Sequence, residues 1–252
     1  MNKFWQKIWA ADKPAIEQQI RRRSIVAFSL FAVFILCVVV GLKLLNQHQD
    51  IFRKNFEATE KVFAKATYST EHLSKTFPIS AAAKKVRVNG DVGMKDDFDP
   101  NTWRLKVVRK TGDTLYISMD DIEAMPKTDI VFDFKCVEGW SQVTHWAGVK
   151  YSEFIKKYKL DPESKMTYVG MITPDSKYYV GIDMPSMMHE QTLLCYEMNG
   201  KALPMNQGYP LRLIIPVKYG IKHLKRIGTM YFSDTRPKDY WAERGYDYFA
   251  GL

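Results

Sequence analysis

The residues best suited to chemistry gather in the stretch 198–233, which contains six Lys or Arg and no Asp or Glu. Glycines and prolines divide this stretch into short strands and tight turns, so its cations sit on a constrained backbone. Cations held in this way, without competing carboxylates, suit a buried anion such as a phosphate. Because Arg212 lies within the apolar run 210–216, which indicates a buried strand, we favour an anion site over a solvated basic face. The six cations are Lys201, Arg212, Lys218, Lys222, Lys225 and Arg226.

Cys136 is the candidate metal ligand, because it ends an apolar alternating segment and is followed by Glu138-Gly139-Trp140. A soft thiolate suits a transition metal, and a positive field near the thiol would keep it deprotonated. Two plainer interpretations stay open, namely a buried free cysteine and a disulfide with Cys195. On its own, Cys195 is expected to be a core residue. The cysteine and histidine spacing does not predict a zinc site.

Several function classes are excluded by what the sequence lacks. It contains no Gly-x-Ser-x-Gly elbow, Walker loop, GxGxxG or HExxH motif, so common hydrolase and nucleotide-binding chemistry has no local support. The net charge of +9 divides into +5 from residues 1–45 (7 minus 2) and +4 from the rest (30 minus 26). Since no nucleic-acid-binding motif accompanies this charge, a nucleic-acid partner is not expected.

Residues 84–252 predict one α+β domain of mixed strands and short helices. Short apolar stretches bounded by turn residues are typical of strands, and two stretches have helical spacing. Strands and helices do not alternate as βαβ units, which disfavours a doubly wound nucleotide-binding sheet. The expected strands are 103–109, 114–118, 130–136, 167–172, 178–182, 193–198 and 211–217, and the expected helices are 119–125 and 151–158.

Residues 24–45 predict a transmembrane anchor. The first 19 of them carry no charge, and the whole segment would form a helix about 33 Å long, enough for a bilayer core of about 30 Å. Cations outnumber acids before this segment, so the positive-inside rule places residues 1–23 in the cytoplasm and the domain outside. The flanks predict a short interfacial helix over 12–23 and a helical stalk over 46–83. Arg22-Arg23-Ser24 also resembles a twin-arginine export signal.

Four blocks of sequence carry a family resemblance. Residues 135–141 read Lys-Cys-Val-Glu-Gly-Trp-Ser, which resembles the strand-end pattern of the sulfite-oxidase-type molybdopterin enzymes. Residues 200–204 (Gly-Lys-Ala-Leu-Pro), 208–216 (Gly-Tyr-Pro-Leu-Arg-Leu-Ile-Ile-Pro) and 218–225 (Lys-Tyr-Gly-Ile-Lys-His-Leu-Lys) follow in the family's order. The resemblance covers about residues 84–233 and is closest to the catalytic subunits of periplasmic protein-methionine-sulfoxide reductases.

The resemblance implies a sulfite-oxidase-like fold and a molybdenum-molybdopterin cofactor, with Cys136 and two cofactor sulfurs as metal ligands. His145 stands beside the expected metal, where it would either contact substrate or cap a loop. The other residues implied to contact the cofactor are Asn89, Thr173, Lys201, Gln207, Arg212, Lys222, His223, Leu224 and Lys225. Of these, Arg212 is the expected pterin or phosphate arginine, and 223–225 the expected phosphate turn.

The resemblance further implies oxygen-atom transfer at a molybdenum that cycles between +6 and +4. The expected substrate is an S-oxide or an N-oxide, because no arginine-rich anion pocket for sulfite can be placed near Cys136. No CxxCH haem motif is present, so a haem-bearing membrane subunit or a cytochrome is the expected electron partner. The expected location is the cytoplasmic membrane, with the catalytic domain in the periplasm.

Two other functions stay open at the level of sequence. The first is a non-catalytic, membrane-tethered binding or assembly module that keeps the fold without the metal. An unused Cys136 or a disulfide with Cys195 would mark it. The second is a sensor that binds a free phosphate-containing ligand through Arg212, Lys222 and Lys225.

Overall fold

The computed structural model describes residues 3–47, 58–59, 62, 72–88, 90–94 and 98–251. It divides the chain into two compact units, residues 1–61 and 62–252. The first unit contains one long helix, α1 (Lys3–Gln47). The second unit contains the strands and the short helices.

Helix α1 is continuous through residues 12–23, which were predicted to form a separate interfacial helix. Within it, Ile16–Leu45 is long and apolar enough to cross a membrane, and an 18-residue part of it has a mean hydropathy of 3.0. Thirty helical residues extend about 45 Å, which exceeds the bilayer core of about 30 Å. Most of the predicted stalk, residues 46–83, lies outside the described residues.

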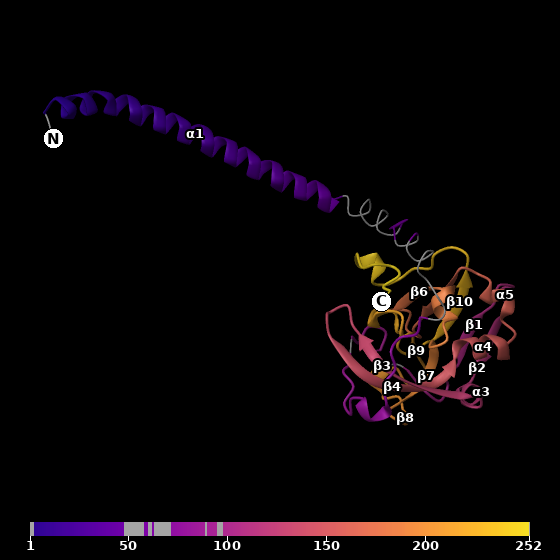
Figure 1. Ribbon diagram of the computed structural model, residues 1–252. Helices are drawn as coiled ribbons and strands as arrows, with labels where there is room; N and C mark the ends of the chain where they lie inside the picture. Colours follow the sequence, from indigo (N-terminus) through magenta and orange to yellow (C-terminus); the bar gives the residue numbers. More distant parts are fainter. Residues whose placement is uncertain are drawn as a thin grey trace. The chain divides into compact units, whose positions relative to one another are not determined.

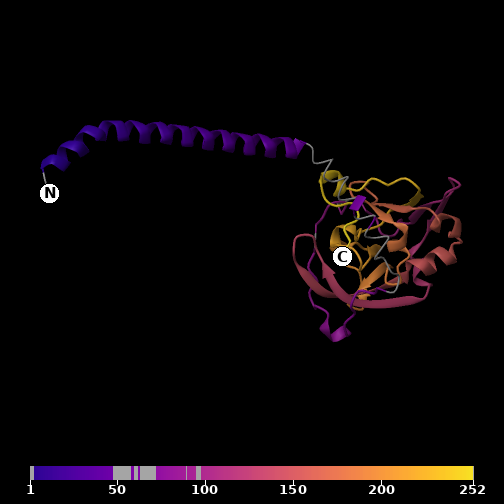
Figure 2. The ribbon, with the colours of Figure 1, turned by 45° about the horizontal axis from the view of Figure 1, so that its top comes forward.

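One sheet contains the strands nearest to Cys136, in the order β3-β4-β7-β8, with β9 also paired to β7. The long β3–β4 hairpin curves along one edge of the domain (Figures 1 and 2). All pairings in this sheet are antiparallel. Its strands are β3 (Lys127–Lys135), β4 (Ser141–Lys150), β7 (Leu193–Met198), β8 (Lys201–Ala202) and β9 (Arg212–Ile214).

The second sheet has the order β2-β1-β10-β5-β6. β1 and β10 are parallel, whereas the other neighbours are antiparallel, so the sheet is mixed. The parallel pair joins segments more than 100 residues apart in the sequence. Its strands are β1 (Leu105–Val108), β2 (Thr114–Ile117), β5 (Tyr168–Ile172), β6 (Tyr179–Asp183) and β10 (Thr229–Ser233).

Short helices and 3-10 turns connect the strands. In α3 the Ser118 side chain accepts from the Asp121 backbone N–H and the Asp121 carboxylate accepts from the Ser118 backbone N–H, which is a capping box. The short elements are α3 (Met119–Glu123), α4 (Tyr151–Lys157), α5 (Asp161–Ser164), α6 (Met184–Met187), η1 (Ile79–Ala81), η2 (Met205–Gln207), η3 (Gly220–Lys222) and η4 (Ala242–Arg244).

Two apolar cores lie on opposite faces of the first sheet. Leu194 and Tyr196 of β7 belong to the larger core, which also includes the second sheet. Leu193 and Cys195 of the same strand belong to a smaller core with Phe134. Because both faces are covered, β7 and β4 are buried almost continuously. The mixed α+β fold is therefore as predicted, but the ten-residue strand β4 was missed, since a strand covered on both faces has no alternating polar pattern.

Residues 72–83, which the sequence assigned to the stalk, hydrogen-bond to the domain. The backbone N–H of Ser74 donates to Gln191 Oε1 at 2.8 Å, and that of Phe77 donates to the Val131 carbonyl at 2.9 Å. Thr76 forms an isolated antiparallel bridge with Phe132 of β3. The residues that hydrogen-bond to the domain therefore begin before residue 84, where the sequence placed the domain boundary.

Candidate active site

A cavity of about 110 Å³ joins Cys136 to the basic stretch. Cys136 and Glu138 come from the β3–β4 turn, and Gly220, His223 and Lys225 come from the segment after β9. These two pieces of sequence are more than 80 residues apart, and the pairing of β4 and β9 with β7 brings them together. Tyr178, Trp241 and Tyr246 complete much of the wall.

The β3–β4 turn fixes the position of the Cys136 thiol. The backbone N–H of Cys136 donates to the Trp140 carbonyl at 2.9 Å, and that of Gly139 donates to the Cys136 carbonyl at 3.0 Å. Gly139 has a φ of +84°, which favours glycine because it has no Cβ. The turn leaves the thiol buried, with Sγ 3.9 Å from Glu138 Oε2.

The electrostatics at Cys136 differ from the expectation of a positive field that keeps the thiol ionised. Burial raises the pKa of the Cys136 thiol, and the negative charge of Glu138 raises it further. The cationic groups of the basic stretch do not outweigh these effects in the cofactor-free protein. A bound metal ion would oppose this shift, because it deprotonates a coordinating thiol directly.

Arg212 is a buried cation with unused hydrogen-bond donors. Its Nη1 donates to the Gln207 carbonyl at 3.0 Å and to Gln207 Oε1 at 2.8 Å, and the guanidinium lies 4.4 Å from the centre of the Trp146 ring. Within the described part of the chain, Arg212 Nε and Nη2 have no hydrogen-bond partner and no carboxylate pairs with the guanidinium. Burial lowers its pKa to about 10. Orphaned buried donors on a cation suit an anionic or strongly accepting ligand.

Gln207 links Arg212 to the strand-like segment before Gly90. Its Nε2 lies 3.3 Å from the Arg87 carbonyl and 3.5 Å from the Val86 carbonyl. The Gln207 side chain thereby fixes the position of the guanidinium rather than pointing into the cavity.

The turn 223–225 is constrained by its own backbone and by Gly208. The Nε2 of His223 lies 3.1 Å from the Lys218 carbonyl, and the Ile215 N–H donates to Nδ1 at 3.4 Å. This arrangement fits a neutral imidazole, and burial lowers the pKa of His223 to about 3. Gly208 has a φ of +103°, and a Cβ there would lie 2.9 Å from the Cβ of Lys225, so a side chain at this position would clash with the turn.

Lys225 places a buried ammonium group on the cavity wall. Its Nζ donates to the Gly90 carbonyl at 2.8 Å and to the Asn206 carbonyl at 3.3 Å. Burial lowers its pKa to about 7, and the neighbouring charge of Arg212 contributes to the decrease. Neutral carbonyls compensate a buried cation less well than an anion does, so a phosphate would compete for this group.

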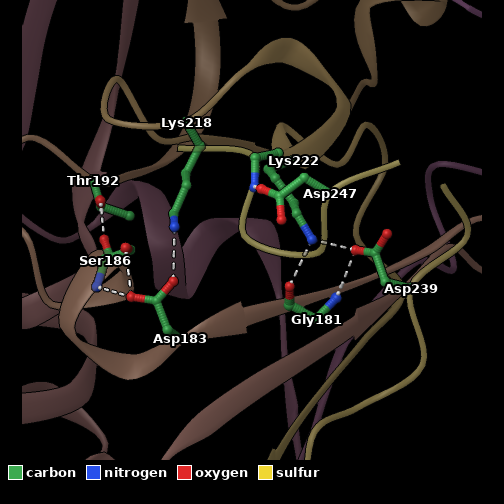
Figure 3. A network of polar contacts seen from close by, with 9 residues as sticks. Gly181, Asp183, Ser186, Thr192, Lys218, Lys222, Asp239 and Asp247 are labelled. Atoms are coloured by element: carbon green, nitrogen blue, oxygen red, sulfur yellow. Dashed lines mark hydrogen bonds and ion pairs between the residues drawn. The ribbon is translucent and has the colours of Figure 1, made fainter. Parts of the chain in front are cut away.

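Lys222 and Lys201 are not brought to the cavity. The Lys222 side chain does not line the cavity, and its Nζ lies 2.5 Å from Asp239 Oδ2 and donates to the Gly181 carbonyl at 3.0 Å (Figure 3). Its backbone belongs to η3, which lines the cavity at Gly220. Lys201 is exposed on β8. Their predicted roles as cofactor ligands lack support because both side chains are directed elsewhere.

His145 faces away from the cavity. His145 lies on β4 and pairs with Val131 of β3. This pair is four residue pairs from the hairpin end at Lys135 and Ser141, a distance of about 13 Å along a strand. Its side chain alternates with that of Trp146, which packs on the cavity side with Phe134. Its Nε2 lies 2.7 Å from Asp129 Oδ1. A role at the metal is therefore not supported, whereas the contact with Asp129 gives the His145 side chain a hydrogen-bonding role within the sheet.

The three remaining predicted contacts have different outcomes. Leu224 is fully buried in the larger core. Thr173 is buried at the end of β5, where its hydroxyl donates to Asp175 Oδ1 at 2.6 Å and accepts from the Tyr178 N–H at 3.1 Å. It therefore supports the turn that carries Tyr178, which lines the cavity. Asn89 lies outside the described residues.

Sequence reasoning missed three aromatic residues of the cavity wall, Tyr178, Trp241 and Tyr246. The aromatic density of residues 240–249 was the available signal. A cluster of aromatic residues ordinarily indicates packing, so this signal alone does not distinguish a cavity wall from a core.

The two sheets and the short helices between them form a sulfite-oxidase-like fold. The solved structure of the sulfane dehydrogenase SoxCD from Paracoccus pantotrophus shares this fold with a TM-score of 0.51 at 18% identity, over 66% of this chain and 46% of that chain. Residues 91–241 match the model of the oxidoreductase molybdopterin binding domain, and the chain belongs to this family of molybdopterin-dependent oxidoreductases.

Three named proteins are also similar to this chain in sequence. The proposed protein-methionine-sulfoxide reductase subunit YedZ1 of Azospira oryzae is 32% identical over 73% of this chain and 70% of its own length. The catalytic subunit MsrP of Campylobacter jejuni is 30% identical over 64% of this chain and 60% of its own length. The MsrP of Xanthomonas axonopodis is 32% identical over 55% and 47%. The chain therefore spans between about half and 70% of the length of these relatives.

The residues present fit a molybdopterin. A thiol and a buried ammonium line one cavity, and the Arg212 guanidinium, with two orphaned nitrogens, lines a separate small pocket with Gln207 and Trp146. A pterin with its dithiolene and phosphate is larger than 110 Å³, so the cavity would have to widen to hold it.

Lys225 makes the stability of the cofactor-free protein depend on pH. Its folded-state pKa is about 7, whereas an unfolded lysine titrates near about 10.4. Between these values the unfolded chain binds more protons, so the contribution of Lys225 to stability rises with pH across this window and is lost as pH falls through about 7. We expect the midpoint temperature of thermal unfolding to increase when the pH is raised from about 6.5 to about 9, and to increase more in the wild type than in Lys225→Met. Lys201→Met is the exposed control, and equal pH dependence in all three proteins would contradict the assignment.

Proposed function

We propose that this chain is a membrane-anchored, molybdenum-dependent reductase of S-oxides. The observation that carries this proposal is one cavity that contains both the Cys136 thiol and the Lys225 ammonium of the turn 223–225. The names of the MsrP relatives support an S-oxide as the substrate class. All three cysteines are free, so the disulfide that would mark a non-catalytic module does not form.

The proposed reaction converts a sulfoxide to a thioether. The S–O bond breaks, two electrons and two protons are consumed, and the oxygen leaves as water. The bound cofactor would supply the oxygen-atom transfer and the two-electron chemistry. Cys136 would ligate the metal, while Lys225 and Arg212 would bind the anionic and accepting groups of the pterin. The buried wall would exclude bulk water around the reacting sulfur.

The electrons would come from a separate haem subunit or cytochrome. This proposal rests on the absence of a CxxCH motif from the sequence and on the redox partner that a reductase of this family requires. The helix Ile16–Leu45 would hold the domain near a membrane-bound donor. The charge bias before the helix supports a single-pass protein with its catalytic domain in the periplasm.

Elemental analysis tests this function directly. We expect about one molybdenum per chain in the purified full-length protein, since a single thiol and a single cationic turn form one site. The reduced protein should give a paramagnetic molybdenum signal. With a reduced dye as donor, it should convert dimethyl sulfoxide to dimethyl sulfide. Well-folded protein from cofactor-producing cells that contains no molybdenum would refute the proposal.

A further inference from the structure

The segment 237–251, here called the capping segment, contributes two aromatic side chains to the cavity that contains Cys136. They are Trp241, which is half-buried, and Tyr246, which is 42% exposed. Their ring centres lie 5.0 Å apart with an angle of 70° between the planes, so the rings pack edge to face. The family match ends at residue 241, so most of the capping segment lies beyond it.

Asp239 attaches the first part of the capping segment to the sheet. Its Oδ2 accepts from Lys222 Nζ at 2.5 Å and from the Gly181 N–H of β6 at 3.2 Å (Figure 3). Its Oδ1 accepts from the backbone N–H groups of Trp241 at 3.2 Å and Ala242 at 3.0 Å. One buried carboxylate therefore ties the backbone at Trp241 to Lys222 of η3 and to Gly181 of β6.

A second set of contacts holds the far end of the capping segment. The Tyr219 N–H donates to the Ala250 carbonyl at 2.9 Å, and Lys218 forms a bridge with Gly251. The Lys218 ammonium is itself fixed by Asp183 Oδ1 at 2.8 Å (Figure 3). The loop that carries Trp241 and Tyr246 is thus tied at both ends, which indicates a fixed wall rather than a mobile lid.

The chemistry of this wall defines the ligand that it accepts. Indole and phenol rings offer apolar surface and favourable contacts to sulfur, and neither ring carries a charge for an anion such as sulfite. Trp241 and Tyr246 share one cavity with Cys136, so the substituents of a substrate bound there would meet these two rings. We propose that Trp241 and Tyr246 are specificity-determining residues that admit S-oxides with small alkyl groups and reject those with bulky aryl groups. This proposal rests on the proposed S-oxide reductase function.

The first test needs neither cofactor nor turnover. Full-length protein with Cys37→Ser, produced in cells that cannot make the pterin, retains Cys136 and the fully buried Cys195 as its thiols. Its alkylation by iodoacetamide is followed by mass spectrometry of each cysteine peptide. We expect Tyr246→Ala and Trp241→Leu each to accelerate labelling of Cys136 by about fivefold or more, since access limits the reaction of a buried thiol. Cys195 labelling should stay unchanged.

The second test uses the molybdenum-loaded protein and two substrates, dimethyl sulfoxide and methyl phenyl sulfoxide. We expect Trp241→Leu to raise the ratio of kcat/KM for the aryl over the methyl substrate by about tenfold or more, since filling or opening an apolar pocket changes selectivity by about that amount. Trp241→Phe, which keeps an aromatic wall, should restore most of the original ratio. Molybdenum content per chain should match the wild type.

Tyr116→Ala is the matched control, because Tyr116 is an exposed aromatic residue on β2, outside the cavity. It should change neither the labelling of Cys136 nor the substrate ratio. Unchanged labelling and an unchanged ratio in both Trp241→Leu and Tyr246→Ala would overturn the inference. If the molybdenum-loaded wild type reduces no S-oxide, the proposed function fails. Accelerated labelling of Cys136 would still show that Trp241 and Tyr246 limit access to this thiol.

Discussion

Cys136→Ser is expected to lower the S-oxide reductase kcat by more than about 100-fold, since loss of a metal ligand should exceed the 10–100-fold effect of losing a supporting contact. A serine hydroxyl is a harder and less acidic ligand than a thiol, so it binds a soft metal poorly. The domain should stay folded, because the Cys136 thiol lies at the long distance of 3.9 Å from Glu138 Oε2 and serine is slightly smaller.

Cys195→Ser is the matched control for this substitution. Cys195 is fully buried, donates to the Glu197 carbonyl at 3.1 Å, and lies outside the cavity. A serine can keep that hydrogen bond, so kcat should change little. Activity with a reduced dye, molybdenum content and thermal unfolding would be measured for both variants. Retention of more than about a tenth of wild-type kcat in Cys136→Ser would argue against ligation, since one tenth corresponds to only about 1.4 kcal/mol.

Arg212→Met should lower pterin occupancy by about ten- to a hundredfold for each charge-assisted hydrogen bond that is lost, since such bonds contribute about 1.5–3 kcal/mol. The prediction follows from the buried guanidinium whose Nε and Nη2 have no partner among the described residues. A structural arginine would instead use these donors within the protein. Methionine keeps much of the apolar stem packed beside Trp146.

Two measurements separate ligand binding from folding in this variant. Pterin released from purified protein reports occupancy, and unfolding of the cofactor-free protein reports stability. We expect a large loss of occupancy with a stability loss of about 1–3 kcal/mol, which is the cost of leaving the Gln207 acceptors unpaired. Lys201→Ala, at an exposed position, should change neither quantity. Full occupancy in Arg212→Met would remove Arg212 from the proposed cofactor site.

Local sequence patterns correctly predicted the elements whose formation depends on nearby residues alone. The uncharged run 24–42 required a membrane-length helix, because length and hydropathy alone determine whether a segment can cross a bilayer. The segments 114–118 and 193–198 were predicted as strands from short apolar runs between turn residues, and β2 and β7 match them. In contrast, β4 was missed because cores on both of its faces remove the alternating pattern.

The sequence by itself determined the membrane-length helix, the mixed α+β class, the Cys136 turn and the acid-free basic stretch. Only the tertiary structure decided which cations face the cavity. Lys222 and Lys225 are three residues apart in one turn, yet Asp239 binds the first and the cavity receives the second. Likewise, His145 is turned away by strand alternation, and Trp241 is brought in by a carboxylate that also contacts β6. Side-chain direction depends on partners distant in the sequence, and local composition carries no information about them.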